Sequence, residues 1–136
     1  MALATIKGGN RTIVIRTAAD GGQGVATYIL SDVSDGLVGT YAIHFVSSTF
    51  VGSVTVQGRS RLISDADAAP AFLPIPYLAL NTGGSVGTYA TGANAAITGT
   101  GIIHVPASGL TVALDATVVT SGTLTCYVVP IHGAAA

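Results

Sequence analysis

The feature that most constrains this chain is its near lack of charged helix formers. The 136 residues include no glutamate and a single lysine. Val, Ile, Thr, Tyr and Phe dominate instead, with glycine-rich breaks at short intervals. Such residues fit the pleated, half-buried surface of a sheet. The sequence therefore predicts an all-β fold with strands near 11–17, 25–30, 40–47, 52–58, 72–80, 86–91, 100–105, 110–119 and 122–129.

Apolar and polar residues alternate most clearly between positions 110 and 129. This period of two indicates strands with one buried and one wetter face. Thr120, Ser121 and Gly122 read as a turn, so we expect 110–119 and 122–129 to form a hairpin. The predicted inward residues share one core with Val54 and Val56: Val112, Leu114, Val118, Leu124, Cys126 and Val128. Tyr41, Ile43 and Phe45 form a further apolar row.

Short strands at this spacing are typical of a sandwich or barrel and not of βαβ units. We predict an antiparallel β-sandwich of the jelly-roll type, with short terminal arms. A single domain is expected over 11–132, with an N-terminal arm at 1–10 and a C-terminal tail at 133–136. Turns are expected at 19–24, 31–36, 81–84, 106–109 and 120–122, where Gly, Asp, Asn and Ser favour them.

The composition excludes several classes of protein. Five basic and six acidic residues give a net charge of −1, which offers no basic footprint for nucleic acid. One cysteine allows no internal disulfide. The start of the chain lacks the pattern of a signal peptide, so none is expected. The most apolar segment, 68–80, contains three prolines and is too short for a membrane span, which needs about 20 residues.

No set of residues forms a catalytic motif. His44, His104 and His132 share no spacing that would bring them together, and Cys126 alternates with apolar neighbours as a core residue does. Gly21–Gly24 lacks the Lys and Ser/Thr of a phosphate loop. We therefore expect a protein that has no enzymatic activity and holds no cofactor and no resident metal. Loose Ca²⁺ binding stays open at two loops, which hold Asp32 with Asp35 and Asp65 with Asp67.

The segment 72–80 is the candidate interface. It carries large apolar residues, while Pro74 and Pro76 each remove a ladder donor, which places such a strand at a sheet edge or bulge. A chain with so few charges also leaves its surface and edges open to other subunits. The expected interface residues are Phe72, Leu73, Ile75, Tyr77, Leu78, Arg59 and Arg61. Tyr77 and Leu78 are favoured, and the sequence leaves open which of them points outward.

The order of strands from 50 to 129 resembles a known type of virion protein. The relevant segments are FVGSVTVQGR (50–59), FLPIPY (72–77), ITGTGIIHV (97–105), LTVALDATVV (110–119) and SGTLTCYVV (121–129). This order is similar to that of small β-sandwich or jelly-roll proteins of tailed bacteriophages, which are capsid decoration (cement) and related head or tail accessory proteins. The resemblance covers about 80 residues. It rests on the order and residue pattern of the strands, and it identifies no functional residues.

The resemblance implies a structural task on the virion. The leading expectation is a decoration protein that binds the major capsid protein at the capsid surface as a homo-oligomer, most often a trimer, after synthesis in the host cytoplasm. The alternative is a tail, fibre or spike module that binds carbohydrate on a host surface. Sugar sites usually expose aromatic rings, and the chain has no Trp and only five Tyr.

Overall fold

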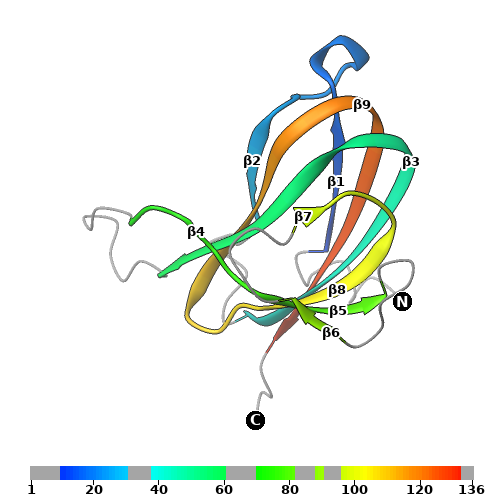
Figure 1. The fold of residues 1–136 in the computed structure, drawn as a ribbon. Coiled ribbons are helices and arrows are strands. Elements are labelled where there is room, and N and C mark those ends of the chain that lie inside the picture. Colours follow the sequence, from blue (N-terminus) through cyan, green and yellow to red (C-terminus); the bar gives the residue numbers. More distant parts are fainter. Residues whose placement is uncertain (1–9, 31–37, 61–69, 82–87, 91–95, 133–136) are drawn as a thin grey trace, which may run out of the picture.

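The computed structural model describes residues 10–30, 38–60, 70–81, 88–90 and 96–132, and within them the fold is all-β (Figure 1). Nine strands form one antiparallel sheet. The strands are β1 (Arg11–Arg16), β2 (Ala26–Ile29), β3 (Val38–Ser60), β4 (Leu73–Pro74), β5 (Tyr77–Asn81), β6 (Thr88–Ala90), β7 (Ala96–Ile97), β8 (Gly101–Pro106) and β9 (Leu110–His132). One 3-10 turn, η1 (Ala18–Asp20), follows β1.

Two long strands organise the sheet. β3 and β9 pair along their whole length, from Val38 opposite His132 to Ser60 opposite Leu110. On the free side of β9, β1 pairs with its second half and β2 with its first half. On the free side of β3, β8 pairs with its first half, and β7 and β4 pair with its second half. Beyond β8 lie β5 and then β6.

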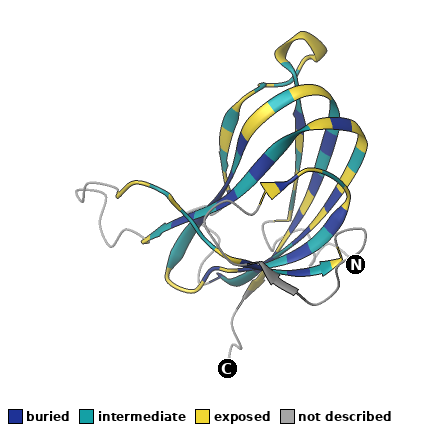
Figure 2. Ribbon diagram, viewed as in Figure 1, coloured by how far each residue is buried: buried dark blue, intermediate teal, exposed yellow. Residues whose placement is uncertain are grey.

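Both long strands bend near their middle, and the bend lets one sheet enclose one core. Register shifts fall between Ser48 and Val54 of β3, and such bulges increase local curvature. Gly122 of β9 has φ +73° and lies against the backbone of Thr49, which leaves no space for a Cβ atom. The buried residues accordingly line the inner side of a strongly curved sheet (Figure 2).

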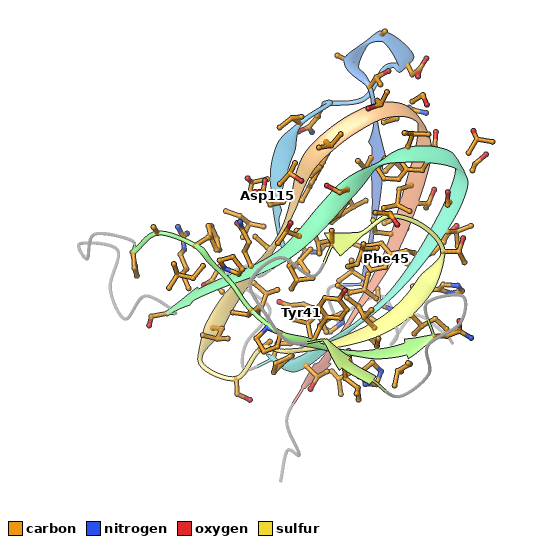
Figure 3. The ribbon with its side chains drawn as sticks, viewed as in Figure 1. Tyr41, Phe45 and Asp115 are labelled. Carbon is orange, nitrogen blue, oxygen red and sulfur yellow. The ribbon has the colours of Figure 1, made fainter. Side chains whose placement is uncertain are left out.

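Side chains from both halves of the curved sheet meet in a single hydrophobic cluster. Figure 3 shows Tyr41 and Phe45 inside the curve. The predicted apolar row of Tyr41, Ile43 and Phe45 is confirmed, because all three are buried. The predicted sharing of one core is confirmed for Val54, Val56, Val112, Leu114, Leu124, Cys126 and Val128.

The prediction that Val118 belongs to this core is wrong, because its side chain is 49% exposed. Ser53 of β3 lies opposite Val118, whereas the next residue, Val54, lies opposite Ala116. Thr117 is therefore an extra residue on β9. This insertion reverses the alternation, so Val118 points outward and Val119 packs against the core.

The predicted hairpin at Thr120–Gly122 is also wrong. Residues 110–132 form one continuous strand, β9, whose two halves do not pair with each other. Likewise, the two strands expected at 40–47 and 52–58 are one strand, β3. The turns expected at 19–24 and 106–109 are confirmed by positive φ angles at Gly21, Gly24 and Gly109. The turn expected at 31–36 lies outside the described residues, as do residues 82–84 of the turn expected at 81–84, whose first residue, Asn81, ends β5.

The strand expected at 72–80 is interrupted at its prolines. β4 ends at Pro74 and β5 begins at Tyr77, after Pro76. β4 pairs with β3 alone among the described strands, as the edge prediction requires. β5 differs from that prediction because it lies between β8 and β6. Of the two favoured residues, Tyr77 points inward and is only 5% exposed, whereas Leu78 lies on the opposite side of the strand and is half-buried.

Candidate interaction surfaces

One half of the outer side of the sheet is apolar. Outward positions of β1, β3 and the second half of β9 carry large hydrophobic side chains that are between 38% and 48% exposed. They define what we call the apolar face: Val14, Val46, Tyr127, Val129 and Ile131. Each alternates with a buried residue of its strand, so the same period of two that builds the core also presents this face to solvent.

Strand register makes these side chains neighbours. Val14 and Val46 both flank Thr125, one on each side of β9. His44 lies opposite Tyr127, with ring centroids 6.3 Å apart. A further row runs from Val129 through Ala42 and His104 to Leu78. Leu78, an expected interface residue, therefore extends this face across β8 to β5.

Charge is sparse on the described part of this face. Arg16, at the end of β1, lies on the same side of its strand as Val14. Arg11, at the start of β1, lines a surface hollow together with Tyr127 and Val129. The remaining outward residues of β1 and of the paired halves of β3 and β9 are Thr, Ser, Ala, His and the apolar set. Interface cores are depleted in charge in this way, so the composition of the face is that of a contact surface.

The other half of the outer side combines a hydrogen-bonded polar cluster with the exposed side chains of Ile29 and Val118. Asp115, on the first half of β9 (Figure 3), accepts a hydrogen bond from the Thr27 hydroxyl at 3.1 Å and another from the Gln57 amide at 3.2 Å. Ser53 and Thr117 share a hydrogen bond of 2.8 Å. These bonds link β2, β9 and β3, so the polar side chains already have partners within the sheet.

The predicted interface around β4 is partly exposed. Leu73 is 66% exposed, and Phe72 and Ile75 are half-buried. The Arg59 guanidinium lies over the Phe72 ring, 4.3 Å from its centroid, and its buried Nε has no hydrogen-bond partner in the described structure. Arg61 lies outside the described residues. Tyr77 belongs to the core, where burial raises its pKa.

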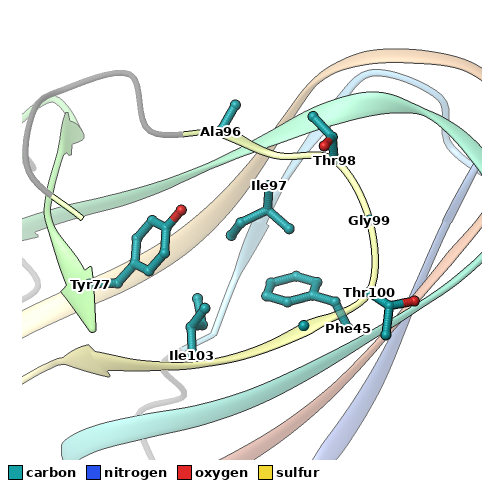
Figure 4. Close-up of a pocket in the computed structure, with 9 residues that line it drawn as sticks. Phe45, Tyr77, Ala96, Ile97, Thr98, Gly99, Thr100 and Ile103 are labelled. Atoms are coloured by element: carbon teal, nitrogen blue, oxygen red, sulfur yellow. The ribbon is translucent and has the colours of Figure 1, made fainter. Parts of the chain in front are cut away.

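A pocket of about 500 Å³ lies beside β5, β7 and β8 (Figure 4). Its apolar lining comes from Phe45, Tyr77, Ile97 and Ile103. Ala96 and the segment 98–101, which is composed of Thr and Gly alone, complete the described lining. None of these residues carries a charge. Sequence reasoning missed this pocket, because its residues come from three separated segments and only Ile97 and its neighbours are consecutive.

The residues weighed for catalysis are not brought together as a catalytic group. His44 and His104 lie on the outer side of the sheet, and the side chain of His132 lies outside the described residues, as do Asp32, Asp35, Asp65 and Asp67. Cys126 is buried, and burial raises the pKa of its thiol to about 12. Within the described ranges, no three His, Cys, Asp or Glu residues converge as a metal site.

Tyr28 adds one polar atom at the core. Its hydroxyl is buried without a hydrogen-bond partner in the described structure. Burial is the main reason that its pKa is raised, with a smaller contribution from Cys126. Tyr28 is partly buried and packs against the hydrophobic core.

No helix in the described part of the chain has the length and apolar character that a membrane crossing requires. In comparisons with known proteins, no family model, curated protein or solved structure matches the chain.

Proposed function

We propose that this protein is a non-enzymatic virion subunit, a capsid decoration (cement) protein that binds the major capsid protein and stabilises the shell. In this proposal the curved sheet is a jelly-roll sandwich, and the protein acts as a homo-oligomer, a trimer, on the capsid surface. The bacteriophage assignment rests on the strand order of residues 50–129, which resembles that of small phage head and tail accessory proteins.

The observation that carries the proposal is the apolar face. Five large hydrophobic side chains, each more than a third exposed, lie together over β1, β9 and β3. On the adjoining surface, by contrast, the Gln57 amide donates a hydrogen bond to the Asp115 carboxylate, so both groups already have a partner within the sheet. Contiguous apolar area on a folded protein marks a contact surface. A protein–protein contact needs such an area and does not need a convergent set of acids, bases or nucleophiles.

The proposal is tested by placing a charge on the apolar face. Val129→Asp buries a carboxylate if this face is covered by another subunit, and desolvation of that charge costs several kcal/mol per contact. Because Val129 is exposed in the isolated chain, the variant should still fold. Sedimentation velocity should show the wild type as an oligomer and Val129→Asp as a smaller species. Cosedimentation with decoration-depleted capsids should be lost in parallel.

Ile29→Asp is the matched control. Ile29 is 46% exposed but lies on β2, beside the polar half of the sheet. This variant introduces the same charge on an equally exposed aliphatic residue, and it should assemble and bind capsids as the wild type does. A wild type that is monomeric and also fails to bind capsids would contradict the proposal. Equal loss in both variants would place the contact elsewhere on the molecule.

One observation favours the alternative, a tail or fibre module that binds host carbohydrate. Tyr127 exposes nearly half of its surface and lies beside His44. An exposed ring with a neighbouring polar group can stack on a sugar and orient it. A glycan array separates the two functions. Saturable glycan binding that is lost in Tyr127→Ala supports the carbohydrate module, and its absence leaves the capsid function.

A further inference from the structure

Two histidines lie among the side chains of the apolar face. His44 is exposed on β3 and His104 is half-buried on β8, and both occupy outward positions of their strands. His44 lies between Tyr127 of β9, with ring centroids 6.3 Å apart, and Ile102 of β8. His104 lies opposite Leu78 of β5. A subunit that covers this face therefore covers both imidazole rings.

The two histidines are also neighbours of each other. β3 and β8 pair so that Ala42 lies opposite His104 and His44 lies opposite Ile102. The histidines are thus diagonal neighbours on one side of the sheet, and such positions are about 7–8 Å apart. Two positive charges at this spacing repel each other, and the repulsion grows when water is removed from between them.

No carboxylate in the described part of this half of the sheet balances a charge on the histidines. Outward positions of β5, β8 and the paired halves of β3 and β9 carry no Asp, Glu, Lys or Arg. Tyr127 adds a phenol beside His44, and β1 adds two basic groups, Arg11 and Arg16. The sequence 82–95, which includes β6, contains no charged residue.

The two acids of the described ranges lie elsewhere. Asp115 is on the other half of the outer side, where it accepts hydrogen bonds from Thr27 and Gln57. Asp20 is in η1, where it accepts a hydrogen bond from the Thr17 hydroxyl at 2.9 Å. A proton added to the histidines therefore increases the positive charge of a face that already has basic groups at its edge.

Protonation acts against covering this face. Histidine is the side chain that ordinarily gains its charge between about pH 8 and pH 5. On the free subunit, water solvates that charge. Under another subunit the charge loses this water, and burying a charge without a counter-ion is costly. Protons therefore bind more readily to the free subunit than to the assembled one, and acid shifts the equilibrium toward free subunits.

We propose that His44 and His104 make the contact at the apolar face sensitive to pH, so that it forms at neutral pH and is released by mild acid. This inference rests on the proposed function, because it needs the apolar face to be covered by another subunit or by the capsid. It adds that the covering surface supplies no carboxylate to the two histidines.

Sedimentation velocity and capsid cosedimentation at about pH 7.5 and about pH 5.5, at equal ionic strength, test the inference on either side of the range in which histidine titrates. The dissociation constant of the wild type should be about tenfold or more higher at the lower pH, since each excluded proton contributes up to about tenfold per pH unit. Circular dichroism at both pH values checks that the protein stays folded.

The double variant His44→Gln, His104→Gln removes both titrating groups and keeps polar side chains of similar size at two surface positions. Its assembly should be equally tight at the two pH values. The variant retains His132, the only other histidine of the chain, which therefore serves as the internal control.

A second measurement needs no substitution at the histidines. Diethyl pyrocarbonate acylates accessible neutral imidazole rings, and mass spectrometry reports each site separately. At neutral pH, His44 and His104 should react several-fold more slowly in the assembled wild type than in Val129→Asp, which is expected to form a smaller species.

The outcomes separate this inference from the proposed function. A wild type that neither assembles nor binds capsids at neutral pH overturns both. Assembly that is equal at the two pH values, tighter in acid, or still pH-dependent in the double histidine variant overturns the inference alone. Equal acylation of His44 and His104 in the assembled wild type and in Val129→Asp also overturns it, because the contact would then leave both rings uncovered.

Discussion

At the scale of single residues, β9 shows how one inserted residue decides between core and surface. Leu114 and Val118 have the same parity in sequence, yet Leu114 is fully buried and Val118 is half-exposed. Thr117, the extra residue between them, causes the difference. Substitution costs should therefore differ sharply at two positions only four residues apart.

Leu114→Ala should lower the free energy of unfolding by about 2–5 kcal/mol, because it removes buried methyl groups and leaves a cavity. Val118→Ala is the control on the same strand and should cost less than about 0.5 kcal/mol. Urea denaturation followed by circular dichroism measures both values. Similar losses in the two variants would mean that the bulge at Thr117 is misplaced.

Cys126 gives a prediction about pH. Folding raises the pKa of its thiol from 9 to about 12 by burial, so the native state holds this proton more tightly than the unfolded chain. The resulting stabilisation is complete below pH 9 and is lost as the pH rises toward 12. Its slope is at most about 1.4 kcal/mol per pH unit.

The alkaline loss of stability is measured by urea titrations between pH 8 and pH 11, within the range set by those two pKa values. Cys126→Ala should lose less stability over this interval than the wild type. Burial also raises the pKa values of Tyr28 and Tyr77. Cys126→Ala retains that part of the loss, except for the smaller contribution that Cys126 makes to the shift of Tyr28. A thiol reagent should label native protein far more slowly than urea-unfolded protein, and equal labelling rates would show that Cys126 is accessible.

At the scale of elements, the sequence predicts where strands form better than how they connect. Alternation in Leu124–Val128 requires only neighbouring residues, so local pattern suffices to predict that strand. Whether the chain reverses or merely bends at Gly122 depends on the Thr49 backbone packed against it. That contact joins residues 73 positions apart, and no local turn signal contains it. A Gly-containing turn motif is compatible with both outcomes.

Gly122→Ala tests the bend. The φ angle of +73° disfavours a side chain, and the Thr49 backbone leaves no room for a Cβ atom. We expect a loss of more than about 1 kcal/mol in the free energy of unfolding. Gly99→Ala is the matched control, since its Cβ meets open space, and it should be close to neutral. A neutral Gly122→Ala would show that the two strands do not approach so closely at the bend.

At the scale of the whole molecule, surfaces are assembled from segments that are far apart in sequence. Val14, Val46 and Val129 meet on one face although more than 80 residues separate the last two. Their outward positions follow from alternation, but their proximity follows from the pairing of β1 and β3 with the same half of β9. The sequence predicted Tyr77 and Leu78 as interface residues. The packing of β5 places Tyr77 in the core and Leu78 on the outer side of the sheet.

The long β3–β9 ladder should be the most stable part of the molecule. Amide hydrogen exchange should be slowest in Tyr41–Phe45 and Leu124–Val128, where each strand has a partner on both sides and side chains are buried. β4 and β7, with two residues each, should exchange much faster. Uniform protection across all strands would indicate that the sheet opens only as a unit.

The central place of β9 also affects how the protein is made. β1 and β2 leave the ribosome early, but their hydrogen-bonding partners lie between residues 113 and 128. β3 likewise lacks its principal neighbour until β9 has been synthesised. Nascent chains that end before residue 110 should therefore remain unfolded, expose their apolar strands and depend on chaperones or be degraded. A prematurely terminated chain that lacks β9 therefore cannot assemble the sheet.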